Sequence, residues 1–86
     1  MQFEVEGTIL VKSAVQAYVQ LRQFTPGDWT LSQTSTLGGI AIEKWTDVPR
    51  ALDANGKQRF DIFAFCLCDP SQISHFSHGQ IVELKI

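Results

Sequence analysis

The stretch around Trp45 combines a flat aromatic ring with positive charge. Lys44 directly precedes Trp45, and three more cations follow in a polar segment, namely Arg50, Lys57 and Arg59. Unpaired bases stack on aromatic rings, each stack contributing about 1–3 kcal/mol, while Lys and Arg side chains contact the phosphates. The pattern therefore predicts a surface for single-stranded nucleic acid. The structural alternatives are a tryptophan buried in the core and loop cations that are merely solvated.

A second set of candidates precedes this stretch. Trp29 offers another ring, and Tyr18 and Arg22 lie four residues apart, a spacing that puts both on one face of a strand. The nearby Phe60, Phe63 and Phe65 belong to an apolar run and are expected in the core rather than at a binding surface.

Potential metal ligands occur as Cys66-x-Cys68 and His75-x-x-His78. This spacing is not that of a common zinc site, and cysteines in an apolar run usually behave as small hydrophobic residues. We therefore expect no metal and no other cofactor. The sequence contains no nucleophile elbow, phosphate-binding loop or zinc-protease motif, and its acids are scattered. We expect no catalytic residues, and hence a protein that is not an enzyme.

Composition sets the broad class. The 86 residues are expected to form one domain, 1–86, and 44% apolar and 19% charged residues are typical of a soluble fold. The net charge of −2 excludes binding to nucleic acid through bulk positive charge alone. Two closely spaced cysteines favour the reducing cytoplasm over a disulfide scaffold. No apolar run is long enough to cross a bilayer, so we expect no membrane association.

The first third of the chain predicts strands, with one ambiguity. The alternation through residues 3–12 breaks at Gly7, which indicates a kinked or bulged strand. Residues 14–24 alternate as a strand does, and their β-branched residues and tyrosine favour that interpretation. The same residues also fit a helix capped by Ser13.

The middle of the chain predicts a hairpin followed by a loop. A turn at residues 25–28 precedes a short strand at 29–33, Gly38 and Gly39 reverse the chain, and residues 40–45 form the next strand. The segment 46–57 is polar and contains Asn55-Gly56, a strong turn signal.

The last third predicts two strands around a short helix. Residues 60–67 read as a buried strand, and Asp69 and Pro70 can begin a brief helix through residue 76. Gly79 ends it, and residues 81–86 alternate as the terminal strand. The expected fold class is mostly β, a small barrel with one short helix before the last strand.

The order of these elements resembles an OB-fold, and residues 39–86 are similar to bacterial and phage single-stranded DNA-binding proteins, including their primosomal relative. Within those residues the matching segments are IAIEKW, the loop with Asn55-Gly56, RFDIFAF and SHGQIVELKI. The first third of the chain matches only loosely, through VEGTI around Gly7. The resemblance implies a replication or recombination accessory that binds single-stranded DNA, or RNA, as a homodimer or higher oligomer. The chain departs from the family in its longer spacing between Gly7 and Trp45, its lower positive charge and the absence of the acidic C-terminal tail.

Two alternatives stay open. A β-domain of this kind can instead bind protein, as an accessory subunit, antitoxin or immunity-type protein, because a fold does not fix a function. If residues 14–24 were helical, the chain would form an α+β sandwich of the ferredoxin-like kind.

Overall fold

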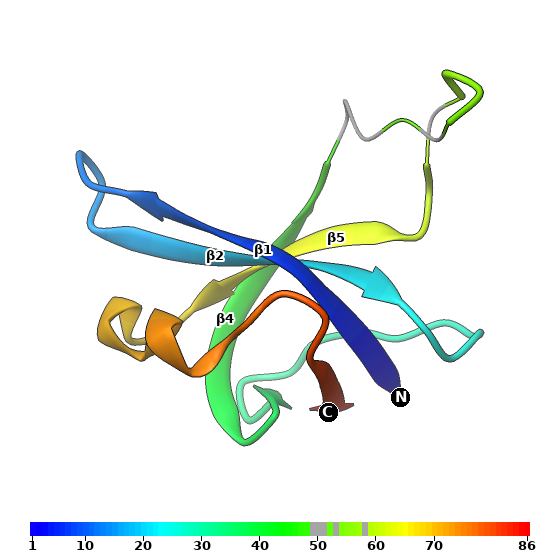
Figure 1. The fold of residues 1–86 in the computed structure, drawn as a ribbon. Helices are drawn as coiled ribbons and strands as arrows, with labels where there is room; N and C mark the ends of the chain where they lie inside the picture. Colours follow the sequence, from blue (N-terminus) through cyan, green and yellow to red (C-terminus); the bar gives the residue numbers. More distant parts are fainter. Residues whose placement is uncertain (49–51, 53, 58) are drawn as a thin grey trace.

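The chain folds into a closed barrel of six strands in the order β1-β2-β5-β4-β3-β6, in a computed structural model that describes residues 1–48, 52, 54–57 and 59–86 (Figure 1). The strands are β1 (Gln2–Val11), β2 (Gln16–Gln23), β3 (Thr36–Leu37), β4 (Ile40–Asp47), β5 (Ile62–Leu67) and β6 (Ile81–Lys85). Within the described residues, one short 3-10 helix, η1 (Pro70–His75), precedes β6. The predicted mostly-β barrel with a short helix before its last strand is confirmed.

Strand β2 settles the ambiguity of residues 14–24. Its side chains alternate between buried Ala17, Val19 and Leu21 and half-buried polar neighbours, which is the period of a strand with one face in the core. It pairs antiparallel with β1, and the register shifts between Val5 and Gly7, as the glycine break predicts. The helical interpretation, and with it the α+β sandwich, is wrong.

The short strand predicted at residues 29–33 is also wrong. Residues 24–35 form no strand, and β3 is limited to Thr36–Leu37. The hydroxyl groups explain this: Ser35 Oγ accepts a hydrogen bond from the Ser32 backbone N–H at 2.7 Å, and the Ser35 N–H returns to the Ser32 carbonyl at 3.3 Å. Local bonds of this kind satisfy backbone groups that a strand would offer to a neighbour.

The helix η1 begins where the sequence predicts. The Asp69 carboxylate accepts hydrogen bonds from the backbone N–H of Ser71 at 3.0 Å and from its hydroxyl at 2.7 Å. These bonds hold the pKa of Asp69 below its usual value, because they favour the charged form. Gly79, at φ +85°, then makes the turn into β6.

The core fills the barrel and receives side chains from all six strands, with Phe3 and Phe65 as its largest fully buried side chains. Phe65 therefore lies where the apolar run predicts and Phe63 packs against the core, but Phe60 is 84% exposed. Phe60 precedes β5, so the strand pairing that buries its neighbours does not include it.

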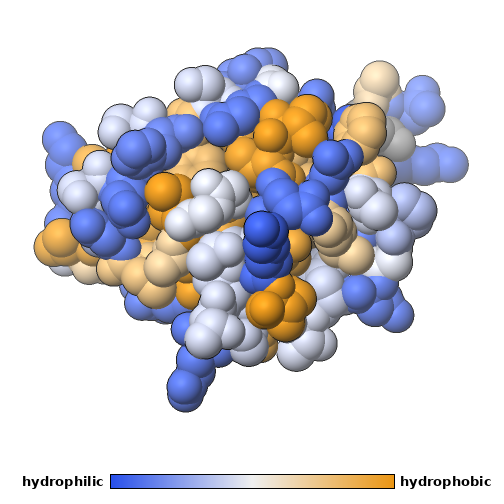
Figure 2. Space-filling view, turned by 90° about the horizontal axis from the view of Figure 1, so that it is seen from below, coloured by the Kyte–Doolittle hydropathy of each residue, from blue (hydrophilic) through white to orange (hydrophobic). Residues whose placement is uncertain are grey.

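Apolar side chains also reach the surface in separate areas between polar ones (Figure 2).

The two ends of the chain meet at one side of the barrel. Strands β1 and β6 pair antiparallel, and the terminal amino group lies 2.6 Å from the Glu83 carboxylate (Figure 1). This pairing closes the barrel, so its strands have no open sheet edge there.

Candidate functional site

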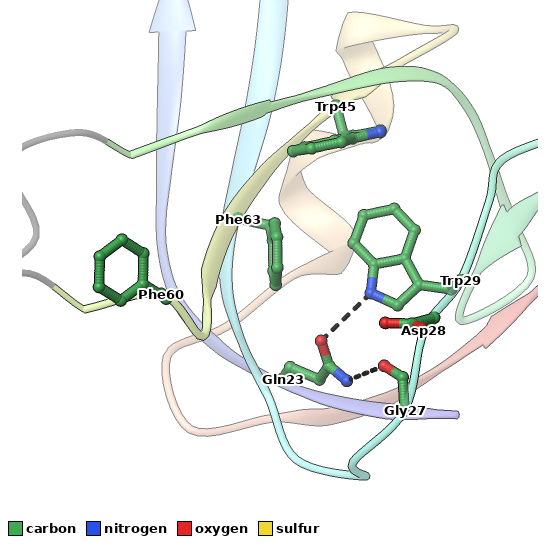
Figure 3. A pocket seen from close by; sticks show the side chains of 7 residues that line it. All are labelled: Gln23, Gly27, Asp28, Trp29, Trp45, Phe60 and Phe63. Atoms are coloured by element: carbon green, nitrogen blue, oxygen red, sulfur yellow. Dashed lines mark hydrogen bonds between the residues drawn. The ribbon is translucent and has the colours of Figure 1, made fainter.

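An aromatic pocket of about 420 Å³ lies at the end of the barrel where β2 and β4 end and β5 begins. We call it the aromatic pocket; its lining residues are Gln23, Gly27, Asp28, Trp29, Trp45, Phe60 and Phe63. Three strands and the loop after β2 contribute to it (Figure 3). Its volume lies near the lower end of the ~300–1,000 Å³ range of ligand pockets, so it can hold one small flat group.

Three rings of the pocket pack edge to face. The Trp29 ring centroid lies 5.0 Å from that of Phe63 and 5.3 Å from that of Trp45, and the Trp45 and Phe63 centroids are 5.6 Å apart. Trp29 also contacts the core rings of Phe3 and Phe65. The aromatic wall is therefore continuous with the hydrophobic core, which limits its freedom to move.

Gln23 fixes the loop that carries Trp29. Its side-chain amide donates hydrogen bonds to the carbonyl oxygens of Thr25, at 2.9 Å, and Gly27, at 2.7 Å. Its Oε1 accepts the Trp29 indole N–H at 3.2 Å (Figure 3). One side chain thus bonds both the turn and the ring, which explains how a loop without secondary structure holds a tryptophan in place.

Two rings of the pocket remain open to solvent. Trp45 is 43% exposed and Phe60 is 84% exposed. Trp29 is less exposed than either, since it is half-buried and packs against the core. Phe60 lies on the far side of Phe63 from both tryptophans (Figure 3). Trp45 and Phe60 are therefore the rings on which an incoming planar group can stack.

Lys44 and Trp45, which the sequence places side by side, face opposite sides of the sheet. Trp45 is opposite the core residue Phe65 on β5, whereas Lys44 is opposite Cys66. Because successive side chains of a strand alternate between faces, the ammonium group and the indole do not share a surface.

Tyr18 and Arg22 share the outer face of β2, as their spacing predicts; their β5 partners are Cys66 and Ile62, which lie outside the core cluster. Tyr18 lines an apolar groove of about 260 Å³, together with Ile9, Val11, Gln20, Thr46, Val48 and Ala64. We call this the outer groove. Arg22 lies 3.4 Å from a Glu4 carboxylate oxygen, and its guanidinium stacks on the exposed Phe24 ring at 5.2 Å.

Arg59 is engaged by two carboxylates. Its guanidinium lies 3.1 Å from Glu6 and 3.3 Å from Asp61. The hydrogen bond to Glu6 is the main reason that the pKa of Arg59 is raised above its ordinary value. Lys57 is exposed in the loop between β4 and β5, and Arg50 lies outside the described residues. Of the predicted cations that the structure describes, none lines the aromatic pocket.

The cysteines and histidines do not assemble. Cys66 is buried and Cys68 is exposed, as are His75 and His78. Burial raises the pKa of the Cys66 thiol, and the nearby Glu43 carboxylate raises it further. Among the residues that the structure describes, no group of three potential ligands is close enough to hold a metal ion.

Sequence reasoning missed Gln23 and Asp28 and assigned Phe60 and Phe63 to the core. The turn at residues 25–28 carried a usable signal, since a turn brings the residues on its two sides close together. Gln23 and Trp29 flank that turn and bond to each other.

Comparison of the chain with protein-family models, with curated proteins and with solved structures finds no match. In the described part of the chain, no helix is long and apolar enough to cross a membrane. Function must therefore be inferred from the residues and geometry of this barrel.

Proposed function

We propose that this barrel binds single-stranded nucleic acid by stacking unpaired bases at the aromatic pocket. Trp45 and Phe60 are the stacking surfaces, and Trp29 and Phe63 support them. The observation that carries the proposal is the exposure of two large rings, Trp45 at 43% and Phe60 at 84%, beside a pocket of one-base size. Aromatic side chains normally contribute their area to the core, so exposed rings at a pocket favour a planar ligand.

Among the described residues, few cations lie near the aromatic pocket, which limits the phosphate contacts that a bound strand can make. Arg22 and Arg59 are paired with carboxylates, and Lys44 faces away from Trp45, so few cations are positioned to neutralise phosphates near the pocket. Lys57 is exposed in the loop that leads to Phe60 and does not line the pocket. Affinity should therefore come mainly from stacking, and it should fall only gently with salt, because each phosphate contact steepens that dependence.

The test is an anisotropy titration of fluorescently labelled oligo-dT with the wild-type protein and two variants. Trp45→Ala should weaken binding by about 5- to 100-fold, the loss of one stacked base. Tyr18→Ala, an aromatic truncation on the outer groove, is the matched control and should leave the affinity unchanged. Equal weakening by both variants, or none by Trp45→Ala in a folded protein, would contradict the proposal.

A second candidate function is the binding of a protein partner, and the outer groove favours it. The groove is almost entirely apolar, and Ile9, one of its lining residues, is 48% exposed. Exposed apolar surface of this kind is typical of interaction sites. This function would be selected if the protein ignored oligonucleotides at low salt but co-purified with one partner, and if Ile9→Asp abolished that co-purification.

We also propose a cellular role and an oligomeric state for this barrel. A role as a replication or recombination accessory is proposed on the family resemblance of the sequence, and two free cysteines favour the reducing cytoplasm. A homodimer or higher oligomer would extend the short footprint of one barrel. Light scattering with and without oligonucleotide measures that assembly directly.

A further inference from the structure

The polar groups that face the aromatic pocket are mostly hydrogen-bond acceptors. Both amide hydrogens of Gln23 are used on the carbonyls of Thr25 and Gly27, and the Trp29 indole N–H is used on Gln23 Oε1. Trp45 keeps its indole N–H, but its nitrogen lies at the end of the ring farthest from Phe60 (Figure 3). A ligand beside Gln23 and Asp28 therefore meets oxygen atoms, each with a lone pair to share.

Asp28 is the strongest of these acceptors. Its carboxylate lies beside Gln23 and below Trp29, on the same side of the pocket as the Gly27 carbonyl (Figure 3). No hydrogen bond or ion pair joins this carboxylate to any residue that the structure describes. Asp28 is exposed, and among the described lining residues it is the one charged side chain, so at low salt the pocket favours a group that donates hydrogen bonds over a phosphate.

We infer that the pocket takes a single nucleobase whose edge carries two neighbouring N–H donors, and that guanine fits it best. This inference rests on the proposed function. The N1–H and the 2-amino group of guanine point in the same direction, so both can donate to the two oxygens of one carboxylate, and charge-assisted pairs of this kind are strong and directional. Thymine and uracil have one N–H between two carbonyl oxygens, and those oxygens face the carboxylate unfavourably.

The geometry also explains how stacking and reading combine. In this inference, a flat base that stacks on Trp45 or Phe60 turns its edge toward Asp28, which lines the same pocket. Enzymes that extrude a base read it in this way, by aromatic contact with its faces and hydrogen bonds to its pairing edge. A strand bound here would be held with little sequence preference along most of its length, and one position would prefer guanine.

The experiment measures the anisotropy of three labelled pentanucleotides, TTGTT, TTTTT, and a form of TTGTT with deoxyinosine in place of guanosine. Inosine keeps N1–H but lacks the 2-amino group. TTGTT should bind about 5- to 100-fold more tightly than TTTTT, the discrimination that a bidentate base contact provides. The inosine strand should lose much of that preference.

Asp28→Asn removes the charge and replaces one acceptor with a donor, so TTGTT and TTTTT should then bind with similar affinity. Glu43→Gln is the matched control: Glu43 is exposed and faces Cys66, so this variant changes the net charge equally but leaves the preference intact. Circular dichroism verifies that both variants fold.

The outcomes distinguish a failure of the guanine preference from a failure of nucleic-acid binding itself. Equal binding of all three strands, or a guanine preference that survives Asp28→Asn, overturns the inference and leaves the proposed function standing. Folded protein that binds none of the strands at low salt contradicts the proposed function itself. Quenching of tryptophan fluorescence by tetramethylammonium, without a response to any strand, would assign the pocket to an organic cation and overturn both.

Discussion

The aromatic pocket and the outer face of the sheet divide between them the two chemistries that the sequence places together. The pocket holds exposed rings and the Asp28 carboxylate, with no cation among its described lining residues. The outer face holds Arg22 and Arg59, but each is paired with glutamate at 3.4 Å or less. One region therefore offers stacking without positive charge, and the other carries the cations, of which the two arginines are already paired with glutamates.

The cause of this division is the pleat of the strands. Neighbours in sequence, such as Lys44 and Trp45, face opposite sides, whereas residues distant in sequence, such as Arg59 and Glu6, bond directly. A binding surface in a barrel is thus composed of alternate residues. A short stretch of sequence that looks basic and aromatic splits between two faces.

The largest expected effect comes from the support of the pocket. Phe3 is fully buried and contacts Trp29, Phe63 and Phe65. Phe3→Ala should reduce the free energy of unfolding by about 3–5 kcal/mol, because its burial is removed and a cavity is left behind. Urea denaturation measures this. Phe24→Ala removes an exposed ring that packs against Arg22 of the outer face, so it should lower the free energy of unfolding far less. Equal losses in the two variants would mean that Phe3 does not support the pocket.

The next effect concerns two glutamines, one in each region. Gln23→Ala removes three hydrogen bonds and leaves the Trp29 indole N–H without its partner, so it should destabilise the fold by about 1–3 kcal/mol. It should also weaken oligonucleotide binding, since Trp29 supports Trp45. Gln20→Ala, in the outer groove, is the matched control. Thermal unfolding measures the loss of stability, and anisotropy measures the loss of affinity. Similar losses in Gln23→Ala and Gln20→Ala would contradict a special role of Gln23 at the pocket.

A smaller effect is expected from Glu6→Gln, which releases Arg59 from its closer carboxylate. The pair is partly exposed, so stability should fall by only about 0.2–1 kcal/mol. At moderate salt, where distant charges are screened, oligonucleotide affinity should not change, because Arg59 does not line the pocket. Stronger binding by this variant would show that the outer face does contact phosphate.

The smallest effect is a pH dependence at Cys66. Burial raises the pKa of this thiol in the folded protein, so the stabilisation is complete below the unfolded value of about 8.5 and is lost as the pH rises toward the folded value. Stability should therefore fall by less than about 1 kcal/mol between pH 7 and pH 9. Urea midpoints at the two values measure it, and Cys66→Ala should reduce the change; an unaltered pH dependence in that variant would assign it to other groups.

Much of the fold was predictable because its signals are local. The alternation of β2, the glycine break in β1 and the Asp69-Pro70 start of η1 each depend on a few neighbouring residues, and each is confirmed. The strand predicted at residues 29–33 does not form, because Ser32 and Ser35 hydrogen-bond to each other rather than to a neighbouring strand. Competing local hydrogen bonds of this kind leave no trace in hydrophobic alternation.

The candidate site was predictable only in part. Trp29 and Trp45 do meet, with ring centroids 5.3 Å apart. Their polar partners did not follow from sequence, because the contact between Gln23 and Trp29 depends on a loop, and the neutralisation of Arg59 by Glu6 joins the first strand to the residues just before β5. Pairings over such distances are set by the register of the closed barrel.

The most direct test of the account is a solution NMR titration of the labelled protein with an unlabelled pentanucleotide that contains one guanine. If bases stack at the aromatic pocket, the indole N–H resonance of Trp45 and the backbone amides of Asp28 and Phe60 should shift, while the backbone amides of Tyr18 and Gln20 in the outer groove should not. Shifts confined to the outer face would contradict this expectation, and would place any binding of nucleic acid on the wrong side of the barrel for the aromatic pocket.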